Sequence, residues 1–183
     1  MADILDKAQK FADCAHKGQK RKASKEDYIN HPIRVAEILK KAGSSEELIC
    51  AGYLHDVVED TSYELDDIEK KFGLKVRRLV AAHTEDKTKT WRERKAHTIT
   101  TVRMADKEVK SLIVADKLDN LSSIENDQRN FGNEVWDFFK AGYDLQQWYY
   151  QSIDEHMLDG LPEQKTPEFF MDYRRLVQRV FSS

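Results

Sequence analysis

The sequence has few of the residues that interrupt helices or crosslink a small fold. Its 183 residues include seven glycines, three prolines and two cysteines. The scarcity of glycine and proline disfavours a fold built from many tight turns, and two cysteines cannot form a disulfide framework. Cys50 lies in an apolar run, so we expect it to be a small core residue.

Long apolar runs and a basic excess are also missing. No apolar stretch approaches the ~20 residues that span a membrane. The first six residues lack the basic and apolar regions of a secretion signal. A net charge of -3 gives no reason to expect a nucleic-acid partner. We therefore expect a cytoplasmic protein without a membrane or nucleic-acid partner, and the sequence does not indicate its oligomeric state.

Helical spacing of apolar residues is what the chain has in abundance. Charged residues make up 34% and hydrophobic residues 40% of the sequence, which is typical of a soluble globular protein. No alternating strand pattern stands out. We predict an all-α fold of about eight or nine helices, with residues 1–183 forming a single domain. The prediction includes a polar loop over 84–90 and a long aromatic-rich helix over 135–158.

The most informative stretch covers residues 53–61. It places His55-Asp56 at the end of an apolar run, and Glu59-Asp60 within about two turns of the same predicted helix. Burying an adjacent His-Asp pair is costly unless something compensates it, and a divalent metal is the natural compensation. In a regular helix His55 and Glu59 share one face, and Asp56 and Asp60 share a neighbouring face.

His31 and Asp116 are further candidate ligands in apolar surroundings. Two imidazoles and two carboxylates leave coordination positions for water or substrate oxygens, a mixture that suits Mn, Fe or Ni better than a structural zinc. Each residue alone has a plainer interpretation: a lone helical histidine is more often structural, and Asp116 could pair with Lys117 or Arg103. The pattern by itself leaves both interpretations open.

Four ordered segments carry a resemblance to a known family. They are Ala-His-Lys-Gly-Gln-Lys-Arg-Lys at 15–22, Tyr-Ile-Asn-His-Pro-Ile-Arg-Val-Ala at 28–36, Leu-His-Asp-Val-Val-Glu-Asp-Thr at 54–61 and Ala-Asp-Lys-Leu-Asp-Asn-Leu at 115–121. The chain resembles HD-domain metal phosphohydrolases, and more narrowly the hydrolase domain of Rel/SpoT proteins and the single-domain small alarmone hydrolases. The resemblance covers about 8–124, and we expect the helices of 133–183 to pack on that core.

This resemblance implies an HD-domain helical bundle, a reaction and a set of site residues. The reaction is hydrolysis of the 3′-pyrophosphate of guanosine tetra- or pentaphosphate (ppGpp or pppGpp) to GDP or GTP and pyrophosphate. The implied residues are His31, His55, Asp56 and Asp116 for one metal, usually Mn²⁺, Glu59 and Asp60 for catalysis, and Arg21, Lys22 and Asn120 for the nucleotide substrate. A metal-bound water deprotonates near pH ~7, and either catalytic acid could orient it or take its proton.

Two departures from the family keep alternatives open. Relatives often contain Arg-Lys-Ser-Gly-Glu-Pro-Tyr, whereas residues 21–28 are Arg-Lys-Ala-Ser-Lys-Glu-Asp-Tyr, which is one residue longer. Asp119 stands where relatives often have histidine, and its carboxylate would either repel phosphate or point away. The same site could therefore act on an adenosine alarmone analogue or on the 2′-phosphate of NADPH. A third alternative is a nucleotide sensor without turnover.

Two further segments have both a functional and a structural interpretation. Arg94 or Lys95 would contact phosphate or, more commonly for such a pattern, lie on a solvated helix face. The aromatic residues at 148–150 would stack on a base or, more commonly, belong to the core.

Overall fold

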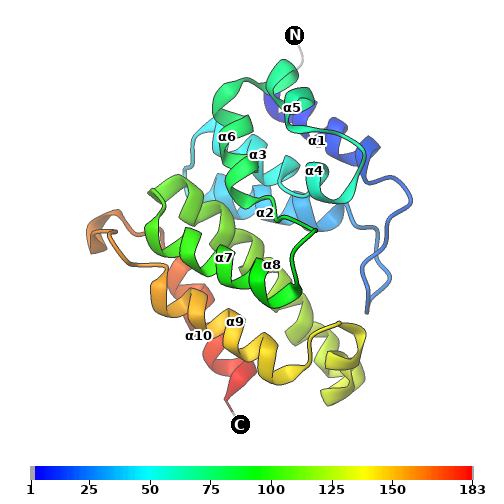
Figure 1. Ribbon diagram of the computed structural model, residues 1–183, viewed down its shortest axis with the longest axis vertical. Coiled ribbons are helices and arrows are strands. Elements are labelled where there is room, and N and C mark those ends of the chain that lie inside the picture. The colour runs from blue at the N-terminus through cyan, green and yellow to red at the C-terminus, as the bar shows by residue number, and fades with distance from the viewer. Residues whose placement is uncertain (1–2, 183) are drawn as a thin grey trace.

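The computed structural model describes residues 3–182 and contains no β-strand in that range, which confirms the predicted all-α fold (Figure 1). The first and last helices, α1 and α10, lie toward opposite ends of the molecule. The elements are α1 (Ile4–Ala15), α2 (Asn30–Lys41), α3 (Glu46–Leu54), α4 (Val57–Asp60), α5 (Leu65–Phe72), α6 (Leu74–His83), α7 (Trp91–Met104), α8 (Lys107–Phe131), the 3-10 helix η1 (Gly132–Phe138), α9 (Tyr143–His156), the 3-10 helix η2 (Glu163–Lys165) and α10 (Phe169–Phe181).

Helix α8 connects the two halves of the molecule. It packs against α2, α3 and α6 from the first half, and against α7, η1 and α10 from the second. The Asp106 carboxylate caps its first turn by accepting a 3.0 Å hydrogen bond from the Val109 backbone N–H. Gly132, with φ 56°, ends it in a conformation that favours glycine. The buried face of α8 therefore holds Asp116 and Asp119 on one rigid element.

The close approach of α2 and α3 depends on Gly52. A Cβ atom at this position would lie 3.0 Å from Leu39 Cδ1 and 3.1 Å from the Ala36 Cα. Contacts this short would force the two helices apart, so glycine permits the packing. The packing brings the ring of His31, in the first turn of α2, within 5.1 Å of the ring of His55, just past the end of α3.

The chain bends where a single helix was predicted over 53–61. Helix α3 ends at Leu54, His55 is its C-cap, and α4 begins at Val57. At the bend Asp56 has φ −102° and ψ −2°. Adjacent side chains on a regular helix diverge by about 100° because the helix has 3.6 residues per turn. The bend instead allows His55 and Asp56 to reach one common centre.

The aromatic-rich helix predicted over 135–158 is wrong in its first part. Residues 132–138 form η1, Phe139 is extended with φ −113° and ψ 147°, and α9 begins only at Tyr143. Val135 and Trp136 are buried within η1. Their apolar character reflects tertiary packing against α8 rather than membership of a long amphipathic helix.

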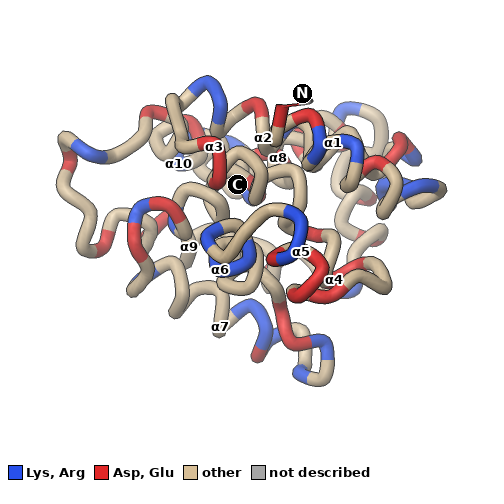
Figure 2. The backbone as a smooth tube through the Cα atoms, turned by 90° about the horizontal axis from the view of Figure 1, so that it is seen from above, with Lys and Arg blue, Asp and Glu red and all other residues tan. Residues whose placement is uncertain are grey.

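Charges are interspersed along the chain. Figure 2 shows lysine and arginine positions alternating with acidic positions over many elements. Among residues 3–182, no helix combines the length and the apolar character needed to cross a membrane.

Candidate metal centre and its cavity

Two histidines and two aspartates meet beside α8. His31 comes from α2, His55 and Asp56 from the bend between α3 and α4, and Asp116 from α8. One potential ligand atom from each residue lies within 4.8 Å of the others, and all four residues are buried. The structure therefore brings together the whole ligand set that the sequence suggested, although its members span 86 positions.

The two imidazoles face each other across this centre. Their Nε2 atoms are 3.2 Å apart. His31 Nε2 lies 2.9 Å from Asp116 Oδ1, and His55 Nε2 lies 3.0 Å from Asp56 Oδ2. Burial disfavours a charged imidazole, yet Asp56 and Asp116 raise the pKa of His55. The carboxylates therefore attract positive charge to the space between the rings.

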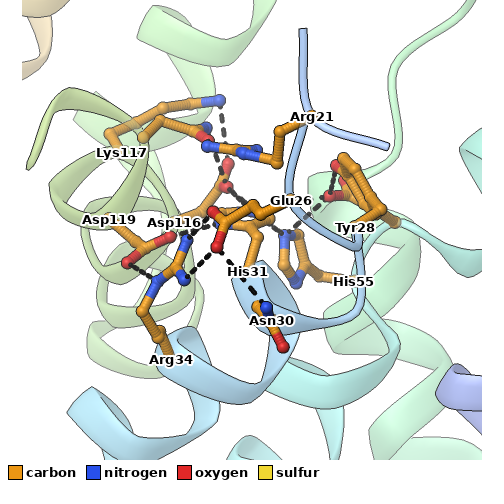
Figure 3. A network of polar contacts seen from close by, with 12 residues as sticks. Arg21, Glu26, Tyr28, Asn30, His31, Arg34, His55, Asp116, Lys117 and Asp119 are labelled. Atoms are coloured by element: carbon orange, nitrogen blue, oxygen red, sulfur yellow. Dashed lines mark hydrogen bonds and ion pairs between the residues drawn. The ribbon is translucent and has the colours of Figure 1, made fainter. Parts of the chain in front are cut away.

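The outer nitrogens of both rings are held by acceptors. His55 Nδ1 donates to the Gly52 carbonyl at 2.7 Å. His31 Nδ1 lies 2.7 Å from Asp119 Oδ2, and both residues are labelled in Figure 3. Because a carbonyl only accepts, and Asp119 accepts as a carboxylate, these bonds leave the Nε2 lone pairs directed at the centre. Two such lone pairs with two carboxylates form a donor set that fits one divalent metal.

Asp119 points away from the cavity. Its Oδ1 atom accepts from Arg34 Nε at 2.8 Å, and Arg34 also donates to both carboxylate oxygens of Glu26, at 2.9 and 3.2 Å. Burial opposes ionisation of Asp119, but hydrogen bonds from His31 and Arg34 hold its pKa below the usual value. The two departures from the family are therefore linked, because Glu26 of the atypical loop fixes the arginine that supports Asp119 (Figure 3).

Replacing Asp119 with asparagine is expected to weaken metal binding about 10- to 100-fold, the usual effect of losing an outer partner of a ligating histidine. The amide can still accept from His31, but it is neutral and makes the imidazole a weaker ligand. Titration of the metal against a competing chelator measures the change. Asp144→Asn, an exposed aspartate in the first turn of α9, is the matched control. Equal affinities in the two variants would contradict the role of Asp119.

Two residues to which the sequence pattern assigned no role also contact the aspartates. The Tyr28 hydroxyl donates to Asp56 Oδ2 at 2.5 Å, and His83 Nε2 lies 2.9 Å from Asp116 Oδ2. The alternative pairing of Asp116 with Lys117 is also present, at 2.8 Å on the same Oδ2 atom. Since Oδ1 faces the two imidazoles, ion pairing and a ligand position coexist on one carboxylate.

Glu59 and Asp60 lie on α4, next to the ligand cluster. One oxygen of each lies within 4.8 Å of an oxygen of Asp56. Burial, followed by the negative charge of Asp56, raises the pKa of both carboxyls. Glu59 Oε1 accepts from the Glu85 backbone N–H at 2.8 Å, and Asp60 pairs with Lys87 Nζ at 3.0 Å. Residues of the 84–90 loop therefore fix the orientation of both acids.

A cavity in two adjoining parts lies beside this centre. One part, of about 260 Å³, is bounded by Asp56, Glu59 and Asp116 among others. A larger part, of about 640 Å³, has the size of a small-molecule site. The two parts share Lys22, Tyr28, Asp60, Lys95, Lys117 and Asn120 in their walls.

The three residues expected to bind substrate all line this cavity. Arg21 Nη2 donates to Asn120 Oδ1 at 3.1 Å, and Asn120 Nδ2 donates to Asp116 Oδ1 at 3.1 Å. Lys22 comes from the same loop as Arg21, and its Nζ atom lies 5.7 Å from the centre of the Phe139 ring. The polar loop is thus connected to the metal centre through one asparagine.

The structure bears on the two segments that had both a functional and a structural interpretation, residues 94–95 and 148–150. Lys95 is not on a solvated face: its side chain is 15% exposed, lines both parts of the cavity and pairs with Glu85 at 2.7 Å. Tyr149 and Tyr150 are buried, as the core interpretation predicts, but they also form part of the cavity wall. Trp148 packs against Trp91 and Arg92.

The fold and the site define a helical domain with a buried cluster of two histidines and two aspartates that can hold a divalent metal, and with a cavity of ligand size beside it. A model of the HD domain family, HD_4, matches residues 8–141. The chain therefore belongs to the HD domain family.

Relatives place the chain within one branch of this family. It is 42% identical over 126 residues to the guanosine-3′,5′-bis(diphosphate) 3′-pyrophosphohydrolase MESH1 of Mus musculus, with 67% of this chain and 70% of the relative aligned. A crystal structure of lmo0812 from Listeria monocytogenes EGD-e superposes with a TM-score of 0.81 at 51% identity, covering 86% of this chain and 98% of that one. The structure of a metazoan ortholog of SpoT that hydrolyses ppGpp superposes with a TM-score of 0.79 at 27% sequence identity, covering 98% of this chain and 96% of that one. The predicted resemblance to small alarmone hydrolases is confirmed.

Proposed function

We propose that this protein hydrolyses the 3′-pyrophosphate of ppGpp and pppGpp, yielding GDP or GTP and pyrophosphate. Water adds to the phosphorus attached to the ribose 3′-oxygen, the bond between that oxygen and phosphorus breaks, and the 3′-oxygen takes up a proton. The observation that carries the proposal is the joint placement of a four-residue metal site, two buried acids and a basic cavity. MESH1 and the SpoT ortholog, which share this chain's family, are named for the same reaction.

The proposed metal ligands are His31, His55, Asp56 and Asp116, and the proposed metal is Mn²⁺. When bound, such an ion lowers the pKa of a coordinated water and favours a phosphoryl oxygen beside it. The chain itself orients both imidazoles through their Nδ1 atoms. Two carboxylates and two neutral imidazoles leave positions for water and substrate oxygens.

Glu59 and Asp60 are the proposed catalytic acids. A carboxyl group with a raised pKa accepts a proton from the attacking water more readily than an ordinary surface carboxylate. The contacts from Glu85 and Lys87 hold each side chain in one direction while it does so. Glu59 borders the part of the cavity nearest the ligands, and Asp60 borders both parts.

Arg21, Lys22 and Asn120 are the proposed nucleotide contacts. Arg21 presents a planar set of donors that suits phosphate oxygens, whereas Lys22 supplies a compact positive charge. Lys95 adds a further ammonium group to the same wall. These cations offset the charge that two pyrophosphate groups bring into a cavity already bordered by Glu59, Asp60 and Asp116.

Residues 1–183 are proposed to act as one domain. Gln146, Tyr149 and Tyr150, all from α9, complete the cavity wall. The helices of 133–183 would then be needed for substrate binding and not only for packing. We also propose a cytoplasmic location and no nucleic-acid partner, as the net charge of -3 leads us to expect.

A substrate panel with Mn²⁺ tests the proposed function. The purified chain is incubated with ppGpp, with the adenosine analogue of ppGpp and with NADPH, and release of pyrophosphate or phosphate is measured with and without a chelator. We expect metal-dependent release of pyrophosphate from ppGpp. If the adenosine analogue or NADPH is hydrolysed faster than ppGpp, that compound, and not ppGpp, is the preferred substrate. Tight binding of ppGpp without any product would instead favour a nucleotide sensor.

A further inference from the structure

The larger part of the cavity follows one face of α8 away from the metal centre. Asn120, Ser123, Ile124 and Asp127 all line it, and their spacing of three or four residues places them on the same side of the helix. Asp127 lies eleven positions after Asp116, which corresponds to roughly 16 Å along a helix that rises ~1.5 Å per residue. The far end of the cavity is therefore about one extended nucleotide away from the metal ligands.

Asp127 is an acid to which the proposed mechanism gives no role. It is only 9% exposed. In the described part of the chain, no hydrogen bond or ion pair reaches its carboxylate, and burial raises its pKa despite the positive charge of Arg21. By contrast, the buried carboxylates of Asp56, Asp116 and Asp119 all have close partners. A carboxylate that lines a cavity and has no protein donor can accept hydrogen bonds from a bound ligand.

The surroundings of Asp127 suit the base of a nucleotide. Ile124 on the same helix face and Phe139 after η1 offer apolar surfaces that a planar ring can contact. Guanine carries two adjacent donors, the N1–H and the 2-amino group, which one carboxylate accepts together. Adenine has an unprotonated N1 and no 2-amino group, so its N1 lone pair would face the carboxylate without a hydrogen bond.

We propose that Asp127 selects guanine over adenine by accepting hydrogen bonds from N1–H and the 2-amino group. This inference rests on the proposed function and deepens it by naming the group that chooses the base. A nucleotide whose 3′-pyrophosphate lies at the metal, and whose ribose lies near Asn120, has its base directed along α8 toward Asp127. Asp127 is then a specificity-determining residue that acts through substrate binding and takes no part in proton transfer at phosphorus.

The test compares wild type with Asp127→Asn on the 3′,5′-bis(diphosphates) of guanosine, inosine, xanthosine and adenosine. An asparagine keeps one acceptor and adds a donor, which suits the C2 carbonyl of xanthine but not the amino group of guanine. We expect kcat/KM for the guanosine substrate to fall about 10- to 100-fold, mainly through KM. We expect the values for the xanthosine and adenosine substrates to rise relative to guanosine, because the added amide N–H can donate to the xanthine C2 carbonyl or to the adenine N1. We also expect the guanosine advantage over inosine to shrink.

Asp137→Asn is the matched control, because Asp137 is exposed in η1 and does not line the cavity. Metal content and thermal stability of all three proteins are measured in parallel. An equal loss for all four substrates, or no change in their ratios, would overturn the role of Asp127 while leaving the proposed function intact. If wild type cleaves none of the four, the proposed function fails. The base preference is then tested by calorimetric binding of GDP, IDP, XDP and ADP, where equal affinities would overturn it.

Discussion

Replacing Asp56 with alanine is expected to abolish metal binding and to lower ppGpp hydrolysis about 1000-fold or more. The Asp56 carboxylate offers one of the four candidate ligand atoms and lies 3.0 Å from the Nε2 atom of His55 and 3.6 Å from that of His31. A bound metal supplies several kcal/mol of transition-state stabilisation, and each ~1.36 kcal/mol corresponds to a tenfold change in rate. Elemental analysis and a pyrophosphate-release assay measure the two effects.

A thermal shift separates metal loss from misfolding in the Asp56 variant. Wild type should gain about 2.7 kcal/mol of stability when the free metal is at a hundred times its dissociation constant, whereas the variant should gain none. Asp56→Asn keeps the side-chain shape and serves as the second variant. Asp144→Asn, exposed on α9, controls for the loss of an aspartate elsewhere. A variant that still binds one metal per chain, or that hydrolyses at the wild-type rate, would contradict the assigned ligand set.

Replacing Glu59 with glutamine is expected to lower kcat about 100- to 10,000-fold, the usual contribution of a general acid or base, while one metal per chain is retained. The amide oxygen can still accept from the Glu85 backbone N–H, so the side chain should keep its direction. What it loses is the ability to take up a proton. Steady-state kinetics combined with elemental analysis therefore separates an effect on catalysis from an effect on metal binding. The Asp56 variant cannot separate the two effects, because it is expected to lose both.

Asp60→Asn shows how the proton-handling role is divided between the two acids. Asp60 is held by Lys87, whereas Glu59 is held by a backbone N–H. Glu163→Gln, exposed in η2, is the matched control for the loss of a glutamate. Full activity in Glu59→Gln and in Asp60→Asn would show that neither acid takes part in catalysis. A loss of metal from Glu59→Gln would show that it acts as a ligand.

The sequence predicted what depends on local pattern and on residue chemistry. Apolar periodicity was sufficient for the all-α fold, because each helix has to bury one stripe of its surface. The candidate ligand set could also be selected from the sequence, since two histidines and two aspartates in apolar stretches need a compensating charge, and the structure brings the four residues together. The order of the four motifs then favoured a metal site over four unrelated buried polar residues.

The bend at His55-Asp56 and the break before α9 were not predictable in this way. In both places tertiary contacts outweigh a helical sequence pattern. The bend directs two adjacent side chains to one centre, and η1 buries Val135 and Trp136 against α8. His83 had no signal in the sequence, because its contact with Asp116 joins the end of α6 to the middle of α8. The spacing along the chain carries no trace of that contact.

The sequence by itself determined the helical class, and it singled out the candidate ligands and the two candidate acids, because these follow from periodicity and from the identity of side chains. Only the tertiary structure decided where the unusual residues point. Asp119 turns toward His31 and Arg34 instead of toward substrate, and Asp127 faces the far end of the cavity without a protein partner in the described chain. The physical reason is that a carboxylate's effect depends on which donors surround it, and those donors come from helices up to 88 positions away.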